Sequence, residues 1–212
     1  MDLFTFLTCP PNALDKDTAR EFAAAWKVEL FEKGRRFAAQ GAPDRLEHII
    51  LNGRATSQIT DPEGRAVCVG FHSGPCVVAP NVARTRNGIS RASLHVNADA
   101  LVAQMDSNAL TELMISSEPI RAWANGILQQ ELALKADREW CLAALGGADR
   151  LAWFREKFPH HEGLFGHYLI ASFLGVTPVT LSRLSRCRTR HADPLKVHLQ
   201  EPVHSGARHL KL

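Results

Sequence analysis

The chain has 212 residues, of which 45% are hydrophobic and 22% are charged, and these fractions exclude a disordered, collagenous or repeat-array protein. No apolar run reaches the roughly 18–20 residues that cross a bilayer, and no Lys or Arg precedes Lys16, so we expect neither a transmembrane nor a secreted protein and no membrane partner. The five cysteines form no CxxC pair, which argues against a disulfide framework or a zinc ribbon and favours the reducing cytoplasm.

The length suggests two domains, because domains centre near roughly 100–150 residues, and the charge differs between the two ends of the chain. Residues 183–212 carry seven Lys or Arg and two acidic residues, a net charge of +5, whereas residues 1–182 carry 18 basic and 20 acidic residues. A basic end suits binding to a nucleic-acid backbone, because each cation at a phosphate releases condensed counterions. The alternative is a solvated basic tail.

The first predicted element is an amphipathic helix over residues 15–26, in which apolar residues recur at helical spacing after an aspartate that can cap the helix. Short segments punctuated by glycine follow, and they predict strands joined by tight turns. The clearest turn is Asp61-Pro62-Glu63-Gly64, because proline presets φ and glycine accepts a positive φ. This turn predicts a β-hairpin.

A long helix is predicted over residues 118–145, where glycine is nearly absent and apolar residues recur every three or four positions. The apolar stripe either packs on its own domain or pairs with a second copy of the chain. We predict a homodimer through this stripe, with the interface residues Ile120, Trp123, Ile127 and Leu134. Gly146-Gly147 ends the helix and marks a domain boundary.

Residues 169–184 predict a helix-turn-helix. Gly175 permits the left-handed turn, Thr177 can cap the second helix, and Pro178 suits its first position. An ordinary corner between two helices has the same spacing. Four nearby arginines favour DNA binding: Arg183, Arg186, Arg188 and Arg190.

This order of elements, together with several motifs, resembles the Crp/Fnr family of bacterial transcription regulators over residues 15–188. The motifs are Phe31-Glu32-Lys33-Gly34, Gly41-Ala42-Pro43-Asp44, Ile49-Ile50-Leu51-Asn52-Gly53-Arg54-Ala55 and Ile170-Ala171-Ser172-Phe173-Leu174-Gly175-Val176-Thr177-Pro178-Val179-Thr180-Leu181-Ser182-Arg183. The resemblance implies an α+β fold with an N-terminal β-roll of the cyclic-nucleotide-binding type (a jelly roll). It divides the chain into a sensing β-roll at 1–117, a dimerisation helix at 118–146, a helix-turn-helix domain at 147–190 and a basic, poorly structured tail at 191–212.

The resemblance also implies two sites. The family's phosphate clamp has a candidate in Ser90-Arg91-Ala92-Ser93, and Gly74, followed here by Pro75, stands for the glycine of the family's ribose-binding Gly-Glu pair. The predicted effector residues are Gly74, Ser90, Arg91 and Ser93. No Asp or Glu occurs between Arg65 and Ala98, so we do not expect cyclic AMP to bind in the usual way, although Arg84 and Arg86 could favour another small anionic effector. The predicted DNA contacts are Thr177, Val179, Thr180, Ser182, Arg183 and Arg186.

The DNA prediction has a rival, because Pro178 and Val179 stand where the family reads bases and residues 189–212 show no winged hairpin. The second hypothesis is therefore a protein-binding signalling module whose helix-turn-helix no longer binds DNA. We find no enzyme motif, catalytic residue or cofactor signature. The histidines at 160, 161 and 167 lack metal-ligand spacing, and Cys68 and Cys76 are either a thiol switch or ordinary core residues.

Overall fold

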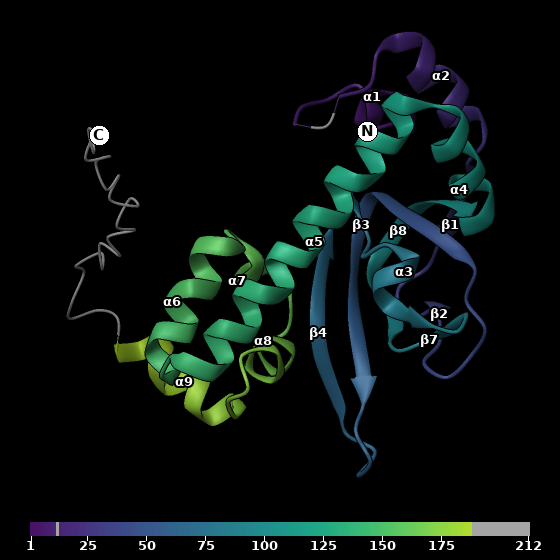
Figure 1. Cartoon of the computed structure of the whole chain (residues 1–212). Helices are drawn as coiled ribbons and strands as arrows, with labels where there is room; N and C mark the ends of the chain where they lie inside the picture. The colour runs from purple at the N-terminus through teal and green to yellow at the C-terminus, as the bar shows by residue number, and fades with distance from the viewer. Residues whose placement is uncertain (12, 188–212) are drawn as a thin grey trace, which may run out of the picture.

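The computed structural model describes residues 1–11 and 13–187 and has a mixed α+β architecture. Its centre is an antiparallel sheet with the strand order β1-β8-β3-β4, in which β2 also pairs with β8 and β5 with β3 (Figure 1). These strands are β1 (Lys27–Phe31), β2 (Arg36–Ala38), β3 (Leu46–Thr60), β4 (Ala66–Ser73), β5 (Cys76–Val77) and β8 (Ser93–Asp106). A short segment with α3 (Asn81–Arg84), β6 (Thr85–Arg86) and β7 (Ile89–Ser90) precedes β8.

The predicted hairpin is present between β3 and β4. Gly64 has φ +81°, and the carboxylate of Asp61 accepts a hydrogen bond of 2.8 Å from the backbone N–H of Arg65. Farther back in β3, Gly53 has φ +94°, and a Cβ at this position would lie 2.2 Å from the carbonyl oxygen of Asp99. The register with β8 shifts around Gly53, so glycine allows the two long strands to bend together.

Helices cover one end of the sheet and form the first part of the core. They are α1 (Leu3–Leu7), α2 (Lys16–Ala24), α4 (Ser107–Ser116) and the beginning of α5 (Glu118–Ala144). The predicted N-terminal helix is α2, and its cap is Asp15, whose carboxylate accepts hydrogen bonds from the backbone of Asp17 and Thr18. Phe22 meets the rings of Trp26 and Trp123 edge-on, at 5.7 and 5.4 Å between centroids.

The apolar stripe of α5 packs on its own chain. Ile120 and Trp123 are buried in the core that α2 shares, Ile127 packs against that core, and Leu134 is half-buried. The burial of Ile120 and Trp123 within their own chain corrects their assignment to a dimer interface, whereas Ile127 and Leu134 keep part of their surface exposed. The physical reason is that spacing shows which face of a helix is buried but does not show which surface covers it.

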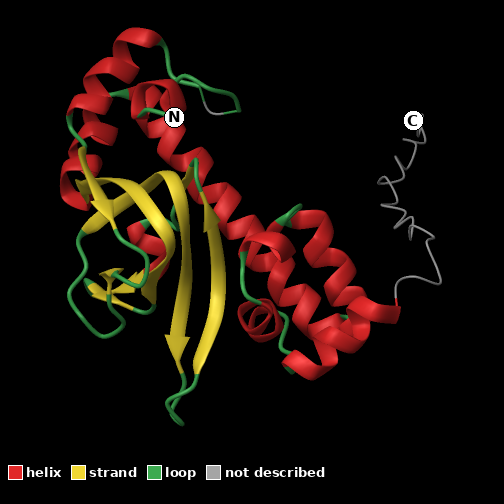
Figure 2. Cartoon of the chain, turned by 180° about the vertical axis from the view of Figure 1, so that it is seen from behind, coloured by secondary structure: helices red, strands yellow, loops and turns green. Residues whose placement is uncertain are grey.

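The C-terminal helical unit, residues 147–187, consists of α6 (Gly147–Lys157), α7 (His161–Leu164), α8 (His167–Phe173) and α9 (Pro178–Cys187). Arg150 joins this unit to α5, because its guanidinium donates hydrogen bonds to the carbonyls of Leu142 and Leu145 at the end of α5 and of Leu174 after α8. As Figures 1 and 2 show, α5 runs from the N-terminal helices past the sheet to this unit.

The helical unit also packs against the edge strand β4. Phe71 of β4 lies 4.8 Å from Phe165 and 5.1 Å from Phe173, measured between ring centroids. The backbone N–H of Cys68 donates a hydrogen bond of 2.8 Å to the hydroxyl of Ser172 in α8. The helical unit therefore covers the edge of the sheet that β4 would otherwise expose (Figure 2).

Two predicted features lie, wholly or in part, beyond residue 187. The expected basic tail, 191–212, and the last residues of the expected helix-turn-helix domain, 188–190, lie outside the described residues. Within the described part, no helix combines the length and the apolar character needed to cross a membrane.

Candidate functional site

The predicted helix-turn-helix is present as α8 and α9. Gly175 adopts φ +64° in the turn, and the hydroxyl of Thr177 accepts a hydrogen bond of 3.1 Å from the backbone N–H of Thr180, which caps α9. Ala171 and Leu181 are fully buried where the two helices meet. The turn thus holds α9 firmly against α8 and fixes which face of α9 reaches solvent.

That solvent face contains most of the predicted DNA-contacting residues. Ser182 is half-buried. The other five are exposed: Thr177, Val179, Thr180, Arg183 and Arg186. The guanidinium of Arg186 donates a hydrogen bond of 3.0 Å to the hydroxyl of Ser182. Arg186 is therefore oriented by a residue of its own helix. The face combines two cations, hydroxyl groups and one apolar side chain, Val179, which is 61% exposed.

The predicted effector residues differ in burial and in hydrogen-bond partners. Ser90 is buried, and its hydroxyl donates to the carbonyl of Ala92 at 2.8 Å. Ser93 is also buried, and its hydroxyl accepts from the backbone N–H of Gln40 at 3.0 Å. Among the described residues, Arg91 lines the adjacent cavity, whereas Gly74, Ser90 and Ser93 are not among its lining residues. The two hydroxyls instead support the backbone of the loop.

Arg91 lines a cavity of about 370 Å³, which we call the cationic pocket. Its walls come from the β-roll (the end of β3, β4 and the neighbouring segment 76–92), from the middle of α5 and from the helical unit. Its titratable side chains are mostly basic: Arg84, Arg91, Lys135, Arg138, His72, His161 and Glu131. Glu131 is the one carboxylate among the described lining residues, and it already pairs with Lys135 at 2.9 Å.

The sequence patterns did not predict Lys135, Arg138, His72 or His161 as parts of this site. Lys135 and Arg138 lie three residues apart on α5, so they share one face of the helix. This spacing is the one sequence pattern that could have indicated a cationic site on α5. His72 and His161 come from β4 and α7, so only the tertiary structure brings them together.

Arg84 is buried with its partners. It forms an ion pair of 3.2 Å with Asp44 and donates hydrogen bonds to the carbonyls of Leu46 and Ala79. Burial lowers the pKa of Arg84, and the nearby carboxylates of Asp44 and Glu47 oppose this shift. Nε of Arg84 has no hydrogen-bond partner within the described residues. Much of the binding capacity of this arginine is therefore used inside the protein.

Arg138 lines the pocket and also contacts Phe173 of the helical unit. Its Nη2 donates a hydrogen bond of 3.0 Å to the carbonyl of Phe173, and its guanidinium lies 4.5 Å from the centroid of the Phe173 ring. Burial lowers the pKa of Arg138, and its Nε is another buried atom without a partner in the described part of the chain.

His72 shows the electrostatic character of the pocket. Its ring nitrogen Nε2 is 2.8 Å from the hydroxyl of Ser57. Burial, reinforced by the positive charges of Lys135, Arg84 and His161, lowers the pKa of His72 to about 4. His72 is therefore neutral at pH 7, and the positive potential in the pocket comes from the arginines and the lysine.

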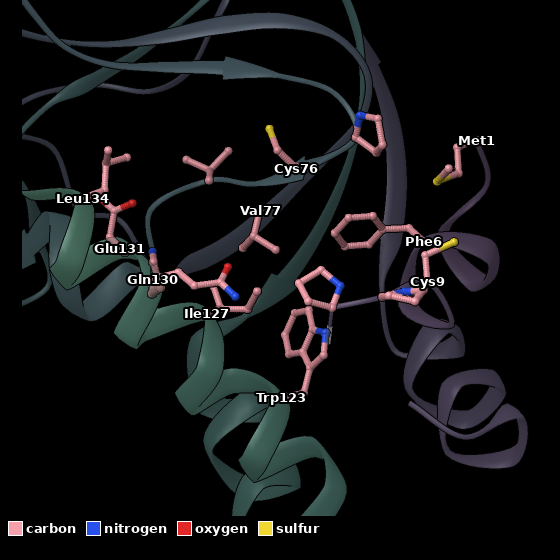
Figure 3. A pocket seen from close by; sticks show the side chains of 15 residues that line it. Met1, Phe6, Cys9, Cys76, Val77, Trp123, Ile127, Gln130, Glu131 and Leu134 are labelled. Atoms are coloured by element: carbon pink, nitrogen blue, oxygen red, sulfur yellow. The ribbon is translucent and has the colours of Figure 1, made fainter. Parts of the chain in front are cut away.

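A second cavity, of about 520 Å³, lies between the N-terminal segment, β5 and α5, and Figure 3 shows Trp123, Ile127 and Leu134 on its wall. It is largely apolar and also contains Cys9 and Cys76. Burial raises the pKa of both Cys76 and Cys68 to about 12, so neither is a thiolate at neutral pH. Their environment is that of core residues, which does not favour a thiol switch.

The three histidines considered as metal ligands have different environments. His161 packs among aromatic rings, 5.2 Å from Phe158 and 5.3 Å from Phe165, whereas His160 and His167 are exposed. Across residues 1–11 and 13–187, no three His, Cys, Asp or Glu side chains are grouped so as to hold a metal ion.

No protein-family model and no curated protein matches the sequence. Solved structures do match. FixK2 from Bradyrhizobium japonicum has a TM-score of 0.67 and 18% identity over 78% of this chain and 85% of FixK2. CLP, a c-di-GMP responsive global regulator of Xanthomonas campestris, has a TM-score of 0.65 and 14% identity over 85% of this chain and 96% of CLP. A double mutant of CooA from Carboxydothermus hydrogenoformans has a TM-score of 0.69 and 14% identity over 90% and 85% of the two chains.

At these identities the likeness shows the fold alone, and it confirms the predicted α+β class with a β-roll and a helical C-terminal region.

Proposed function

Because the chain has the fold of the Crp/Fnr regulators, we propose that it is a homodimeric transcription regulator that binds DNA through α9. The observation that supports this most is the exposed face of α9 in a capped helix-turn-helix. In this motif the second helix enters the major groove, and its first residues approach the bases. We divide the chain into a sensing part at 1–117, a dimerisation helix at 118–146 and a DNA-binding part at 147–190.

The proposed contacts follow from the chemistry of that face. Arg183 and Arg186 lie three residues apart, so both can reach one side of the groove or its bordering phosphates. Thr177, Thr180 and Ser182 offer hydroxyls to phosphate oxygens, and Val179 can contact a thymine methyl group.

The proposed dimer uses the face of α5 that points away from the chain's own core. Residues on that face recur at spacings of four and three: Ala122, Gly126, Gln129, Ala133, Ala136 and Trp140. Gly126 is half-buried, and the other five are exposed. Small side chains at these positions let two helices approach closely. Trp140 is 55% exposed, and a second copy of the chain would bury this apolar surface. A two-fold axis along α5 would present two copies of α9 to DNA.

We further propose that the sensing part responds to a small anion in the cationic pocket and does not bind cyclic AMP in the usual way. The pocket has four basic side chains, and its single described carboxylate, Glu131, is held by Lys135. A ribose hydroxyl would therefore lose its water without gaining a strong acceptor.

Selection of DNA from a random pool tests the regulator. Recovery of a palindrome whose half-sites are about one helical turn apart supports a DNA-binding dimer. Arg183→Ala should weaken binding to that palindrome by about 1–3 kcal/mol if the side chain reads a base, and should weaken all sequences alike if it contacts phosphate.

The second candidate is a protein-binding signalling module, which the exposed apolar side chains Val179 and Tyr168 on the helical unit favour. Recovery of no sequence above background by the full chain would contradict the regulator and support this candidate.

A further inference from the structure

The cationic pocket lies where the sensing part, α5 and the helical unit meet. Phe71 and His72 come from β4, Lys135 from α5, and Phe158 and His161 from the helical unit. A ligand that fills this cavity would therefore contact the helical unit directly as well as the sheet. Binding would then be coupled to the position of the helical unit, and so to α9, which packs against α6 and α8.

Among its described lining residues, the pocket has more Arg and Lys side chains than carboxylates, and some of their hydrogen-bond donors have no partner. Arg91 is exposed, and the described structure pairs Lys135 only with Glu131. Nε of Arg84 and Nε of Arg138 are buried without a partner in the described part of the chain, and the side chain of Arg84 is only 4% exposed. An anion is the ligand that balances the charge of the lining cations and accepts hydrogen bonds from the exposed guanidinium of Arg91.

The remaining wall of the pocket is aromatic. The centroid of the His161 ring lies 6.0 Å from that of Phe71 and 5.2 Å from that of Phe158, and Phe173 lies beneath the guanidinium of Arg138. Such rings offer edges and faces to a planar apolar group. A volume of about 370 Å³ is in the range of sites that enclose a small organic ligand.

We propose that the cationic pocket binds an aromatic anion lacking a ribose-like diol, and that this ligand clamps the helical unit onto β4. Arg91 and Lys135 bind the anionic group, and Phe158 and His161 contact the ring. The ligand stabilises the docked arrangement because part of its site exists only while the helical unit lies against the sheet. This proposal deepens the anion-sensing role proposed above and specifies the class of ligand and the way in which it acts.

Titration of the full chain with 1-naphthyl phosphate, followed by calorimetry, tests the ligand class. Inorganic phosphate, which lacks the ring, and 1-naphthol, which lacks the charge, should each bind at least about tenfold more weakly, since each loses one set of contacts. No saturable binding of 1-naphthyl phosphate at millimolar concentration, or equal binding of 1-naphthol, overturns the proposal.

Matched variants locate the site. Arg91→Met and Lys135→Met should each weaken binding of 1-naphthyl phosphate about tenfold, whereas Arg86→Met, an exposed arginine of the same segment outside the pocket, should leave it unchanged. His161→Gln should also weaken binding, and exposed His167→Gln should not. Unchanged affinity in Lys135→Met or in His161→Gln contradicts a ligand shared by the two parts.

Hydrogen exchange at one backbone amide tests the clamp. The N–H of Cys68 donates to Ser172 of α8, so its protection depends on docking of the helical unit. 1-Naphthyl phosphate should slow exchange at Cys68 more than at the amides that pair β3 with β8. Equal effects at both places overturn the clamp. These measurements need no DNA, so they separate failure of this proposal from failure of the regulator proposal.

Discussion

Two buried histidines, His48 and His72, bind protons less readily in the folded chain than in water. His48 is fully buried, and its Nδ1 is 3.2 Å from the side-chain amide of Gln104. Burial lowers its pKa well below 6.5, and the charges of Arg84 and His72 act in the same direction. The pKa of His72 is lowered to about 4 for the same main reason. Both side chains are thus held neutral in the folded chain but become protonated readily when the chain unfolds.

This difference predicts that the protein loses stability in mild acid. Between pH 6.5 and about 4, the unfolded chain binds a proton at His72 and the folded chain does not, so the free energy of unfolding falls as the pH falls. The slope from His72 is about 1.4 kcal/mol per pH unit, and above pH 6.5 this contribution is constant. Urea unfolding at a series of pH values measures it.

Replacement of the histidine identifies the source of the slope. His72→Gln should reduce the slope between pH 6.5 and about 4, whatever it does to stability at pH 7. His167→Gln, at an exposed position, should leave the slope unchanged. An identical slope in His72→Gln and in the unaltered chain would show that His72 is protonated in the folded state.

Single residues also show how far sequence can predict this fold. Gly64, Gly175 and Thr177 were predicted in their observed roles, and Asp15 is one of the two aspartates, Asp15 and Asp17, that could cap the first predicted helix, because a cap or a tight turn depends on a few adjacent residues. The hydrogen bonds of the Ser90 and Ser93 hydroxyls to Ala92 and Gln40 could not be predicted from the sequence.

At the scale of elements, α5 has two faces that differ in burial. The face with Ile120 and Trp123 is buried by the N-terminal helices, and the opposite face, with Ala133, Ala136 and Trp140, is exposed. Sequence periodicity detects the first face because its side chains are large. It overlooks the second, in which alanines recur, because small residues contribute little to an apolar pattern.

If the exposed face forms the dimer, a charge in its middle should separate the two copies. Ala136→Glu would place two carboxylates against each other near the two-fold axis, and burying them there without partners is costly. We expect a dimer for the unaltered chain and a monomer for Ala136→Glu in sedimentation velocity at tens of micromolar.

Ala152→Glu is the matched control, because Ala152 is an exposed alanine on α6 and not on α5. It should remain dimeric. A dimer that survives Ala136→Glu, or an unaltered chain that is monomeric at this concentration, would reject this interface.

At the scale of the whole molecule, contacts between distant segments join the sensing part to the helical unit. The hydrogen bond between Cys68 and Ser172 spans 104 residues, and the cationic pocket gathers His72, Lys135 and His161. Each of these segments has an ordinary local pattern. The sequence therefore predicted the β-hairpin and the helix-turn-helix separately but could not predict that β4 and α8 lie together, or that a pocket forms between them.

Phe71 is the residue on which this docking depends most. It is 8% exposed and contacts five rings of the helical unit, those of Phe154, Phe158, His161, Phe165 and Phe173. Phe71→Ala should remove about 3–5 kcal/mol, the usual cost of deleting a buried phenylalanine. Because these contacts lie between two parts of the chain, the loss should fall mainly on docking. We expect exchange of the Cys68 amide to accelerate and calorimetry to resolve two unfolding transitions.

Phe37→Ala provides the comparison, because Phe37 packs within the β-roll against Phe31 and His48, at 5.6 and 4.8 Å between centroids. It should destabilise the β-roll without releasing the helical unit, so exchange at Cys68 should accelerate no more than exchange in β3. If both variants lower one common transition and affect the Cys68 amide alike, the two parts unfold as a single unit. In that case a ligand in the pocket stabilises the whole chain and has no separate docking equilibrium to shift.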